Sequence, residues 1–213
     1  NPNDPYVNRD PRFTYSIIHN GLSYINNSAV KTIVYTYTST GSTIANTTAD
    51  AYTPSNNFTG YFSRKMCDEN ISNGLAATTE RAWPLIRYAE ILLNYAEAIN
   101  ETGQPEKAVE KLVILRERAG ILPGADGRYG IKANITTDEL RPLIQNERRI
   151  ELAFEDHRFN DIRRWKIAST VLKGFNSIDI ITRTGTNSFV HTISRAPRPL
   201  NFRNSMYSLT ITL

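Results

Sequence analysis

Carboxylates and arginines alternate in the stretch ERRIELAFEDHRFNDIRRW, which runs from Glu147 to Trp165. Side chains of these two types could perform acid–base catalysis, bind a metal ion, or form a buried structural clamp. Glu151 follows Glu147 by four residues, and Glu155 follows Glu151 by four, so a continuous helix would place all three on one face. Ile144, three residues before Glu147, belongs to the apolar stripe of the same helix. The three carboxylates are therefore expected to lie partly on the core side.

A buried row of carboxylates requires cationic partners. Like charges four residues apart on a helix repel each other, and an unpaired charge is expensive to bury. Arginine can satisfy a carboxylate through two parallel hydrogen bonds. We therefore predict a structural ion-pair cluster with these members: Glu147, Glu151, Glu155, Arg158, Asp161 and Arg164. The expected partners of the three glutamates are Arg158, Arg163 or Arg164. Four apolar residues are expected to seal the contact: Phe154, Phe159, Ile162 and Trp165.

Catalysis by these carboxylates is disfavoured by their surroundings. Glycoside hydrolysis requires one carboxyl group that an apolar setting keeps protonated, whereas nearby arginines lower the pKa of a carboxyl group. A di-iron site requires Glu-x-x-His, but Glu155 precedes His157 by only two residues. The other histidines, His19 and His191, and the single cysteine, Cys67, show no zinc-binding spacing. The sequence therefore predicts neither an enzyme nor a metal or cofactor site, and it leaves a hydrolase as the least favoured alternative.

The composition is that of an ordinary globular protein. Of 213 residues, 40% are apolar and 22% are charged, a balance that excludes an intrinsically disordered chain. The net charge is +4 and the arginines are interleaved with glutamates, so no basic patch predicts a nucleic-acid partner. No apolar run approaches the roughly 18 residues of a membrane helix. The chain starts without Met or an apolar signal segment, so we expect any targeting signal or lipid anchor to lie upstream.

Helical periodicity dominates residues 83–168. An apolar stripe from Leu85 to Ile99 predicts a first helix, which Gly103 would end. A second helix is expected to begin at Pro105 and to end at Gly120. Because the connection is so short, the two helices must form an antiparallel hairpin. The spacing of small and large apolar residues is typical of a tetratricopeptide hairpin.

Two further helices are expected after this hairpin. Thr136 and Glu139 have the spacing of a capping box, which predicts the start of a third helix that continues to about Phe154. A fourth helical stretch is expected from His157 to about Ala168. A single hairpin cannot bury its apolar face alone, so neighbouring helices are implied.

Both ends of the chain lack helical periodicity. Residues 1–82 are rich in Asn, Thr, Ser, Gly and Tyr, and we expect long ordered loops there with one short strand at Lys31–Thr40. After Gly174 we expect loops and short extended pieces. The sequence thus predicts a mainly α fold with tetratricopeptide-like helical hairpins, long irregular loops and a few short strands. The segments 1–82, 83–168 and 169–213 are expected to form one domain.

Four segments, taken in order, resemble the SusD/RagB family of outer-membrane nutrient-binding lipoproteins. The two shorter segments are Asp10-Pro11-Arg12-Phe13 and GYFSRKM, which runs from Gly60 to Met66. The two longer ones are the hairpin IRYAEILLNYAEAINETG with LRERAGI, and the block ERRIELAFEDHRFNDIRRW. The resemblance covers most of residues 10–168.

The resemblance implies a SusD-like helical scaffold on the outer face of the outer membrane of a Gram-negative bacterium of the Bacteroidetes. Proteins of this family bind glycans or other nutrients, form a lid on a SusC-like TonB-dependent transporter, and are not enzymes. This chain resembles only the C-terminal half, so membrane attachment would be through an N-terminal lipid anchor that lies outside it. Cys67 lies in the middle of the chain and cannot be that anchor. The terminal MYSLTITL departs from the usual tail of the family.

Carbohydrate binding is the main functional expectation. Sugars are bound by aromatic faces with Asn, Asp, Arg and Thr at the ring edges, and residues 1–82 supply these types. The expected ligand contacts are Tyr35, Tyr37, Tyr52 and Tyr61, although loop tyrosines more often pin a loop onto neighbouring helices. The alternative is a protein-interaction scaffold of an outer-membrane complex without a sugar site of its own. Exposed aromatic residues on a flat apolar face would favour this alternative.

Overall fold

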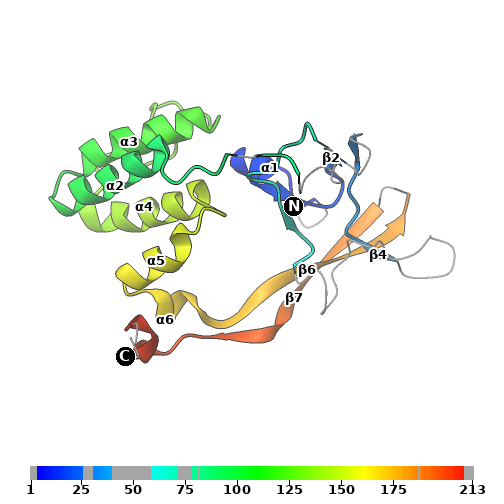
Figure 1. Ribbon diagram of the computed structural model, residues 1–213. Helices are drawn as coiled ribbons and strands as arrows, with labels where there is room; N and C mark the ends of the chain where they lie inside the picture. The colour runs from blue at the N-terminus through cyan, green and yellow to red at the C-terminus, as the bar shows by residue number, and fades with distance from the viewer. Residues whose placement is uncertain are drawn as a thin grey trace. The chain divides into compact units, whose positions relative to one another are not determined.

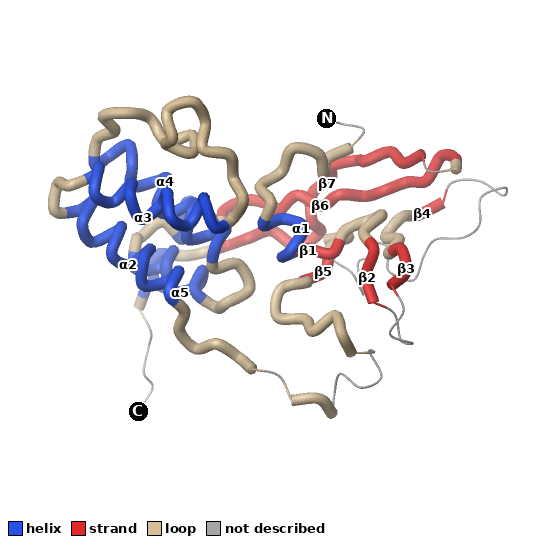
Figure 2. The backbone as a smooth tube through the Cα atoms, turned by 90° about the horizontal axis from the view of Figure 1, so that it is seen from above, coloured by secondary structure: helices blue, strands red, loops and turns tan. Residues whose placement is uncertain are grey.

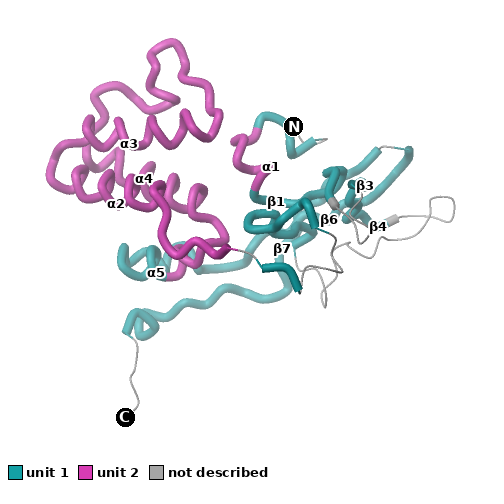
Figure 3. The backbone as a smooth tube through the Cα atoms, turned by 45° about the horizontal axis from the view of Figure 1, so that its top comes forward, with its two compact units in different colours: residues 1–8, 16–81, 160–213 teal, residues 9–15, 82–159 magenta. Residues whose placement is uncertain are grey.

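A computed structural model of the chain (Figure 1) describes residues 4–25, 31–39, 59–71, 78–80, 82–186 and 188–208. The chain divides into two compact units, which are coloured separately in Figure 3. The helical unit comprises residues 9–15 and 82–159. The strand-rich unit comprises residues 1–8, 16–81 and 160–213.

Three long helices make up most of the helical unit: α2 (Tyr88–Glu101), α3 (Pro105–Arg118) and α4 (Thr137–Glu151). They lie side by side in Figures 1 and 2. The backbone between α2 and α3 reverses at Gly103, whose φ of +79° favours glycine. Pro105 is the first residue of α3, as expected. The antiparallel hairpin predicted from the sequence is therefore confirmed, although α2 begins at Tyr88 and leaves Leu85 exposed outside the helix.

The core of the helical unit lies where these three helices meet. Two alanines at the α2–α3 contact, Ala96 and Ala108, are fully buried, because small side chains let two helices approach closely. Leu112 on α3 and Leu140 on α4 fill the space around them. Asn100 is also fully buried, and its side-chain amide donates to the backbone oxygen of Thr137 at 3.1 Å. This bond ties the end of α2 to the start of α4.

The two ends of α4 differ in how well the sequence anticipates them. At its start, Thr136 Oγ1 accepts from the backbone of Glu139 at 3.3 Å, and Glu139 Oε2 accepts from the backbone of Thr136 at 2.9 Å. The predicted capping box is confirmed. The helix ends at Glu151, earlier than the predicted Phe154, because Phe154 adopts a left-handed conformation with φ +64°. Glu155 therefore lies in the turn between α4 and α5 (His157–Arg164).

Among its described residues, the strand-rich unit forms three sheets. In two of them short antiparallel strands pair: β1 (Ile17–Ile18) with β5 (Phe62–Ser63), and β2 (Ser23–Ile25) with β3 (Lys31–Ile33). The third sheet has the order β4-β6-β7. The predicted strand Lys31–Thr40 is thus divided, because β3 and β4 (Thr38–Ser39) pair with different partners. Three short helices complete the described elements. α1 (Arg12–Ser16) lies in the N-terminal part of the chain. α6 (Ala168–Val171) and the 3₁₀ helix η2 (Asn204–Tyr207) lie in the C-terminal part.

The prediction of loops and short extended pieces after Gly174 is wrong. The structure has a long antiparallel pair there, β6 (Lys173–Gly185) and β7 (Ser188–Asn201), drawn in red in Figure 2. Pro197 and Pro199 obscure the signal, because proline cannot donate to a ladder and argues against a central strand. β7 lies at the edge of its sheet, where proline is tolerated.

Candidate functional site

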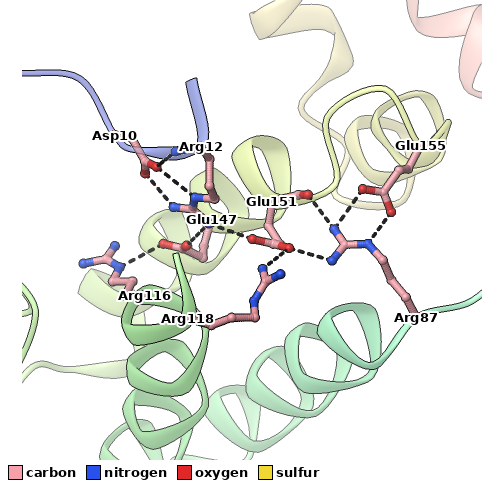
Figure 4. A network of polar contacts seen from close by, with 8 residues as sticks. All are labelled: Asp10, Arg12, Arg87, Arg116, Arg118, Glu147, Glu151 and Glu155. Atoms are coloured by element: carbon pink, nitrogen blue, oxygen red, sulfur yellow. Dashed lines mark hydrogen bonds and ion pairs between the residues drawn. The ribbon is translucent and has the colours of Figure 1, made fainter. Parts of the chain in front are cut away.

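The carboxylates singled out in the sequence meet arginines inside the helical unit (Figure 4). Glu147, on α4, is almost fully buried, with 1% of its surface exposed. Its Oε1 accepts a hydrogen bond from Arg12 Nη1 at 2.7 Å, and its Oε2 accepts one from Arg116 Nε at 2.9 Å. Each carboxylate oxygen of Glu147 thus faces a guanidinium group.

Glu151, one turn further along α4, contacts three arginines. Its Oε2 accepts from Arg12 Nη1 at 2.9 Å, so Arg12 bridges two carboxylates that would repel each other at this spacing. Its Oε1 accepts from Arg87 Nη1 at 2.6 Å and also from Arg118 Nη2. In addition, Arg87 Nη2 donates to the backbone oxygen of Glu151 at 2.6 Å. This bond satisfies one of the carbonyl groups that the end of a helix leaves without an intrahelical partner.

Two further carboxylates hold the arginines in place. Glu155 accepts a bidentate pair from Arg87, with Nε at 2.5 Å and Nη2 at 2.8 Å. Asp10 holds Arg12 in the same way, with Nε at 2.9 Å and Nη2 at 2.6 Å. We call the resulting group of residues the carboxylate–arginine clamp: Asp10, Arg12, Arg87, Arg116, Arg118, Glu147, Glu151 and Glu155.

The electrostatics of the clamp favour the ionised form of two of its carboxylates, Glu151 and Asp10. Burial raises the pKa of Glu151, but hydrogen bonds from Arg87 and Arg12 outweigh burial and leave the pKa below its ordinary value. For Asp10, too, burial is outweighed by hydrogen bonds from Arg12, so the pKa is lowered. Burial acts to lower the pKa of Arg12, but its bonds to Asp10, Glu147 and Glu151 raise it overall. This balance of opposite charges suits a structural clamp better than a general acid.

The clamp joins parts of the chain that are far apart in the sequence. Arg12 comes from α1, Arg87 immediately precedes α2, and Arg116 lies in the last turn of α3. Apart from Asp10, which lies just before α1, their carboxylate partners in the clamp come from the end of α4 and the turn beyond it. Within the ranges that the structure describes, no group of three or more His, Cys, Asp and Glu side chains could hold a metal ion.

The predicted cluster contains three of the four carboxylates of the clamp, all but Asp10, and none of its four arginines. Glu147 and Glu151 lie one turn apart on α4, whereas Glu155 lies in the turn beyond the end of the helix and shares Arg87 with Glu151. The prediction rests on arginines that are near the glutamates in the sequence, whereas Arg12 is 135 residues from Glu147. A signal was present: all four arginines lie in segments that carry the family resemblance. Pairing of the glutamates with Arg158, Arg163 or Arg164 stays a prediction.

The remaining predicted cluster members and the predicted seal are placed differently. Asp161 and Arg164 belong to the strand-rich unit, where Arg164 Nε donates to Asp161 Oδ1 at 2.9 Å. Ile162 is buried, but Phe154 and Phe159 are exposed. The prediction that these two phenylalanines seal the contact is therefore wrong. The early end of α4 is the reason, because it changes the direction in which the following residues point.

The predicted ligand-binding tyrosines occupy different environments in the strand-rich unit. Tyr37 is 5% exposed, and its hydroxyl accepts from Arg183 Nη1 at 2.9 Å. The ring of Tyr35 is more exposed and meets that of Tyr37 edge-on, with 5.4 Å between the ring centroids. Tyr61 donates its hydroxyl to Asp179 Oδ2 at 2.8 Å. Tyr52 lies outside the described residues. Ligand contact by these four tyrosines stays a prediction.

A second polar cluster, which the sequence did not suggest, surrounds Asp179 on β6. Its Oδ2 contacts His191 Nδ1 on β7 at 2.8 Å in addition to the Tyr61 hydroxyl. The ring of Tyr6 meets His191 edge-on and lies 4.0 Å from the ring of His19. Burial, reinforced by the neighbouring Tyr61, raises the pKa of Tyr6. These residues are scattered along the chain, so no local motif could have predicted the cluster.

None of the described helices is long and apolar enough to cross a membrane.

Comparisons with known proteins agree on one family. Two curated relatives come from Formosa agariphila. "SusD-like protein P2" is 45% identical over 87 residues, which cover 40% of this chain and 17% of that protein. "SusD-like protein P38" is 38% identical over 95 residues, which cover 44% of this chain and 19% of that protein.

A solved structure extends the similarity to nearly the whole fold. The crystal structure of a SusD-like protein from Bacteroides fragilis matches 95% of this chain and 35% of its own, with 29% identity and a TM-score of 0.72. The matched region is thus well under half of each of these longer relatives. The model of the SusD family matches residues 1–205. Because that match spans nearly the entire sequence, the chain belongs to the SusD family.

Proposed function

We propose that this chain is the C-terminal part of a cell-surface lipoprotein that binds glycans and delivers oligosaccharides to a SusC-like TonB-dependent transporter. Membership of the SusD family is the observation that carries the proposal, because the family is one of nutrient-binding proteins of polysaccharide utilisation. The protein would be attached to the outer face of the outer membrane by a lipid anchor in its N-terminal part. The helical and strand-rich units would together form one C-terminal domain with a tetratricopeptide-like hairpin.

The strand-rich unit offers the best support for a sugar contact. A sugar ring packs on an exposed aromatic face and needs hydrogen-bonding groups at its edge. Tyr35 is partly exposed and is held edge-on by Tyr37, which Arg183 fixes in turn. This support makes Tyr35 a pre-positioned platform, because its neighbour is already immobilised.

By the family-length protein we mean the longer polypeptide, of the length of the SusD-like relatives, to which this chain is proposed to belong. Calorimetry on that protein tests the proposed function. Titration with a panel of oligosaccharides and polysaccharides should show saturable binding to at least one of them. Tyr35→Ala should weaken that binding about tenfold, which corresponds to the loss of one aromatic contact. Tyr15→Ala is the matched control, because Tyr15 is an exposed tyrosine of the helical unit. Absence of binding across the panel, together with no co-purifying transporter, would reject the proposal.

The proposal includes no catalytic role for the clamp. Each of its carboxylates accepts from at least one guanidinium group, as expected of a structural ion-pair cluster. Turnover of a bound glycan by the purified protein would contradict this part of the proposal.

A protein-interaction scaffold without a sugar site is the alternative function. It is favoured by a row of exposed apolar residues on α2, which includes aliphatic side chains that cannot hydrogen-bond a sugar. Transporter binding without any glycan binding, measured on the same protein, would select this alternative.

A further inference from the structure

Positive charge is concentrated in the C-terminal part of the chain. Residues 160–213 contain eight Lys and Arg residues but only two acidic residues, so this segment has a net charge of +6. The whole chain has a net charge of +4, so residues 1–159 carry −2. The mild charge of the whole chain therefore conceals a strongly basic segment, which belongs to the strand-rich unit.

The two acidic residues of this segment are buried and already paired. Asp161 Oδ1 accepts from Arg164 Nε at 2.9 Å, and Asp179 Oδ2 contacts His191 Nδ1 at 2.8 Å. Asp161 is 4% exposed and Asp179 is 5% exposed. Residues 160–208 therefore present basic side chains to the solvent without any exposed carboxylate among them.

Five of the basic residues are exposed and have no counter-charge. We call them the C-terminal basic surface: Lys166, Lys173, Arg195, Arg198 and Arg203. Within the described part of the chain, none of the five forms an ion pair with a carboxylate. They belong to the region in which the start of β6 and the end of β7 lie beside α6 and η2 (Figure 1).

Strand pairing gathers most of these residues at one end of the β6–β7 pair. Lys173, the first residue of β6, pairs with Asn201, the last residue of β7. Arg195 pairs with a residue only four positions further along β6. Arg198 lies between those two positions of β7, and Arg203 follows the strand by two residues. Four of the five cations therefore lie close together.

Aromatic rings hold two of the cations without neutralising them. Arg195 Cζ lies 5.8 Å from the centre of the Phe175 ring, and Lys166 Nζ lies 4.7 Å from the centre of the Tyr207 ring. A ring attracts a cation through its quadrupole but carries no net charge. Both cations are thus positioned, and their charge remains available to an anion.

The helical unit shows how exposed cations are treated elsewhere in the same protein. Lys132 pairs with Glu139 at 2.6 Å, and Arg141 pairs with Glu101 at 2.7 Å. Interspersed charges of both signs are the usual composition of a soluble surface. The C-terminal basic surface departs from it, and a field of one sign attracts a ligand of the opposite sign.

The distribution of the cations indicates the class of anion. Five cations that come from two strands and the segments next to them cannot all be matched by one small anion, so the ligand must carry repeated charges. Arg195 and Arg198 are three residues apart, which is roughly 10 Å along an extended strand. Duplex DNA carries one charge about every 1.7 Å. The cations are much sparser than that and match a polymer with fewer charges.

We propose that the C-terminal basic surface binds the carboxylate or sulfate groups of an acidic polysaccharide. The inference names the class of glycan and therefore rests on the proposed function. It adds a second contact to the Tyr35 platform. Arg183, which fixes that platform through Tyr37, follows Lys173 by ten residues, or roughly 30 Å along β6. A polysaccharide is long enough to reach both contacts.

Calorimetry with three forms of one polysaccharide tests the role of charge. Dextran, carboxymethyl-dextran and dextran sulfate share a backbone and differ in their anionic groups. The family-length protein should bind at least one of the two anionic forms about tenfold more tightly than dextran, and added salt should weaken that binding. The preferred form distinguishes carboxylate from sulfate recognition. Equal affinity for all three forms, or no binding of either anionic form, would overturn the inference.

Paired substitutions locate the contact. Arg195→Gln combined with Arg203→Gln should weaken binding of the preferred anionic form about tenfold, which is the factor that two exposed ion pairs can supply. The control is Lys132→Gln combined with Arg141→Gln, which removes the same charge from the helical unit and should change the affinity less than about twofold. Equal weakening by both pairs would show attraction to net charge alone and would overturn the inference.

A second pair covers the case in which the first does not fold. Lys173→Gln combined with Arg198→Gln removes the other two cations at this end of the β6–β7 pair. It should weaken binding of the same anionic form, with circular dichroism showing an unchanged fold. Unchanged affinity in this folded variant would contradict the inference.

The outcomes also separate this inference from the proposed function. Binding of a neutral glycan with no gain from anionic groups would keep the proposed function and overturn the inference. Binding to vesicles that contain an anionic phospholipid, but to neither anionic dextran, would assign the surface to a membrane and overturn the inference. Absence of binding to every neutral and acidic glycan would reject the proposed function and the inference with it.

Discussion

Arg12 donates to Glu147 at 2.7 Å although the two residues are 135 positions apart in the sequence. The same Nη1 atom of Arg12 donates to Glu151 at 2.9 Å. One guanidinium group therefore bridges two buried carboxylates of α4, and Asp10 orients that group from its other side. This arrangement makes Arg12 the residue on which the balance of charge in the clamp depends most.

Replacing Arg12 should destabilise the protein strongly. Arg12→Ala leaves two buried carboxylates with fewer partners, and breaking a buried pair costs about 3–5 kcal/mol of unfolding free energy. Denaturant titration, followed by circular dichroism, measures this loss. Arg141→Ala is the control, because Arg141 pairs with Glu101 on the surface, where an ion pair contributes little. Equal effects of the two substitutions would contradict the clamp.

Glu151→Gln distinguishes a clamp from a catalytic carboxylate. Removing the charge should cost about 3 kcal/mol of stability, because three guanidinium groups lose a counter-charge in a buried setting. Thermal unfolding gives the stability, and a reducing-sugar assay gives any turnover. Glu101→Gln, at the surface pair with Arg141, should leave the unfolding temperature nearly unchanged. Intact stability combined with lost turnover would instead assign Glu151 to catalysis.

Acid should weaken the clamp in a defined pH range. The pKa values of Glu151 and Asp10 are lower in the folded protein than their ordinary values of 4.5 and 3.8. The folded state therefore binds fewer protons than the unfolded chain, and stability falls as the pH falls. The contribution is complete above about pH 5 and is lost progressively below the ordinary pKa values.

Unfolding free energies measured between pH 7 and pH 3 test this dependence. The slope should be smaller in Arg12→Ala, because Arg12 lowers the pKa of both carboxyl groups. A variant with the same slope as the unchanged protein would show that other groups cause the acid sensitivity.

The hydroxyl of Tyr61 should stabilise the strand-rich unit through Asp179. Tyr61→Phe removes one of the donors to the buried Asp179 Oδ2, which should cost about 1–2 kcal/mol. Tyr15→Phe changes the same group on an exposed side chain and should have little effect. Hydrogen exchange of the β6 and β7 amides measures the difference locally, with faster exchange expected in Tyr61→Phe alone.

Features encoded by neighbouring residues were predictable from the sequence. The capping box at Thr136 and Glu139 and the turn at Gly103 depend on side chains within one or two turns of each other. The common face of Glu147 and Glu151 follows from helical periodicity alone. For these elements local chemistry and the final fold agree.

Features that depend on distant residues could not be predicted in the same way. Arg12 and Arg87 reach Glu151 from other segments, so the composition of the neighbourhood of Glu151 gave no indication of them. The β6–β7 pair is held by contacts between two strands, each with a weak pattern of its own. A strand with proline, such as β7, depends on its position at the sheet edge, and position is a property of the fold.

The sequence separation of Arg12 and Glu147 also has a consequence for synthesis on the ribosome. Arg12 is translated 135 residues before Glu147, which at the usual rates of elongation means on the order of ten seconds. During that interval Asp10 is the nearest carboxylate partner available to Arg12. The clamp can close only after α4 has emerged from the exit tunnel, so it would fasten the N-terminal segment late, once the α2–α3 hairpin has been made.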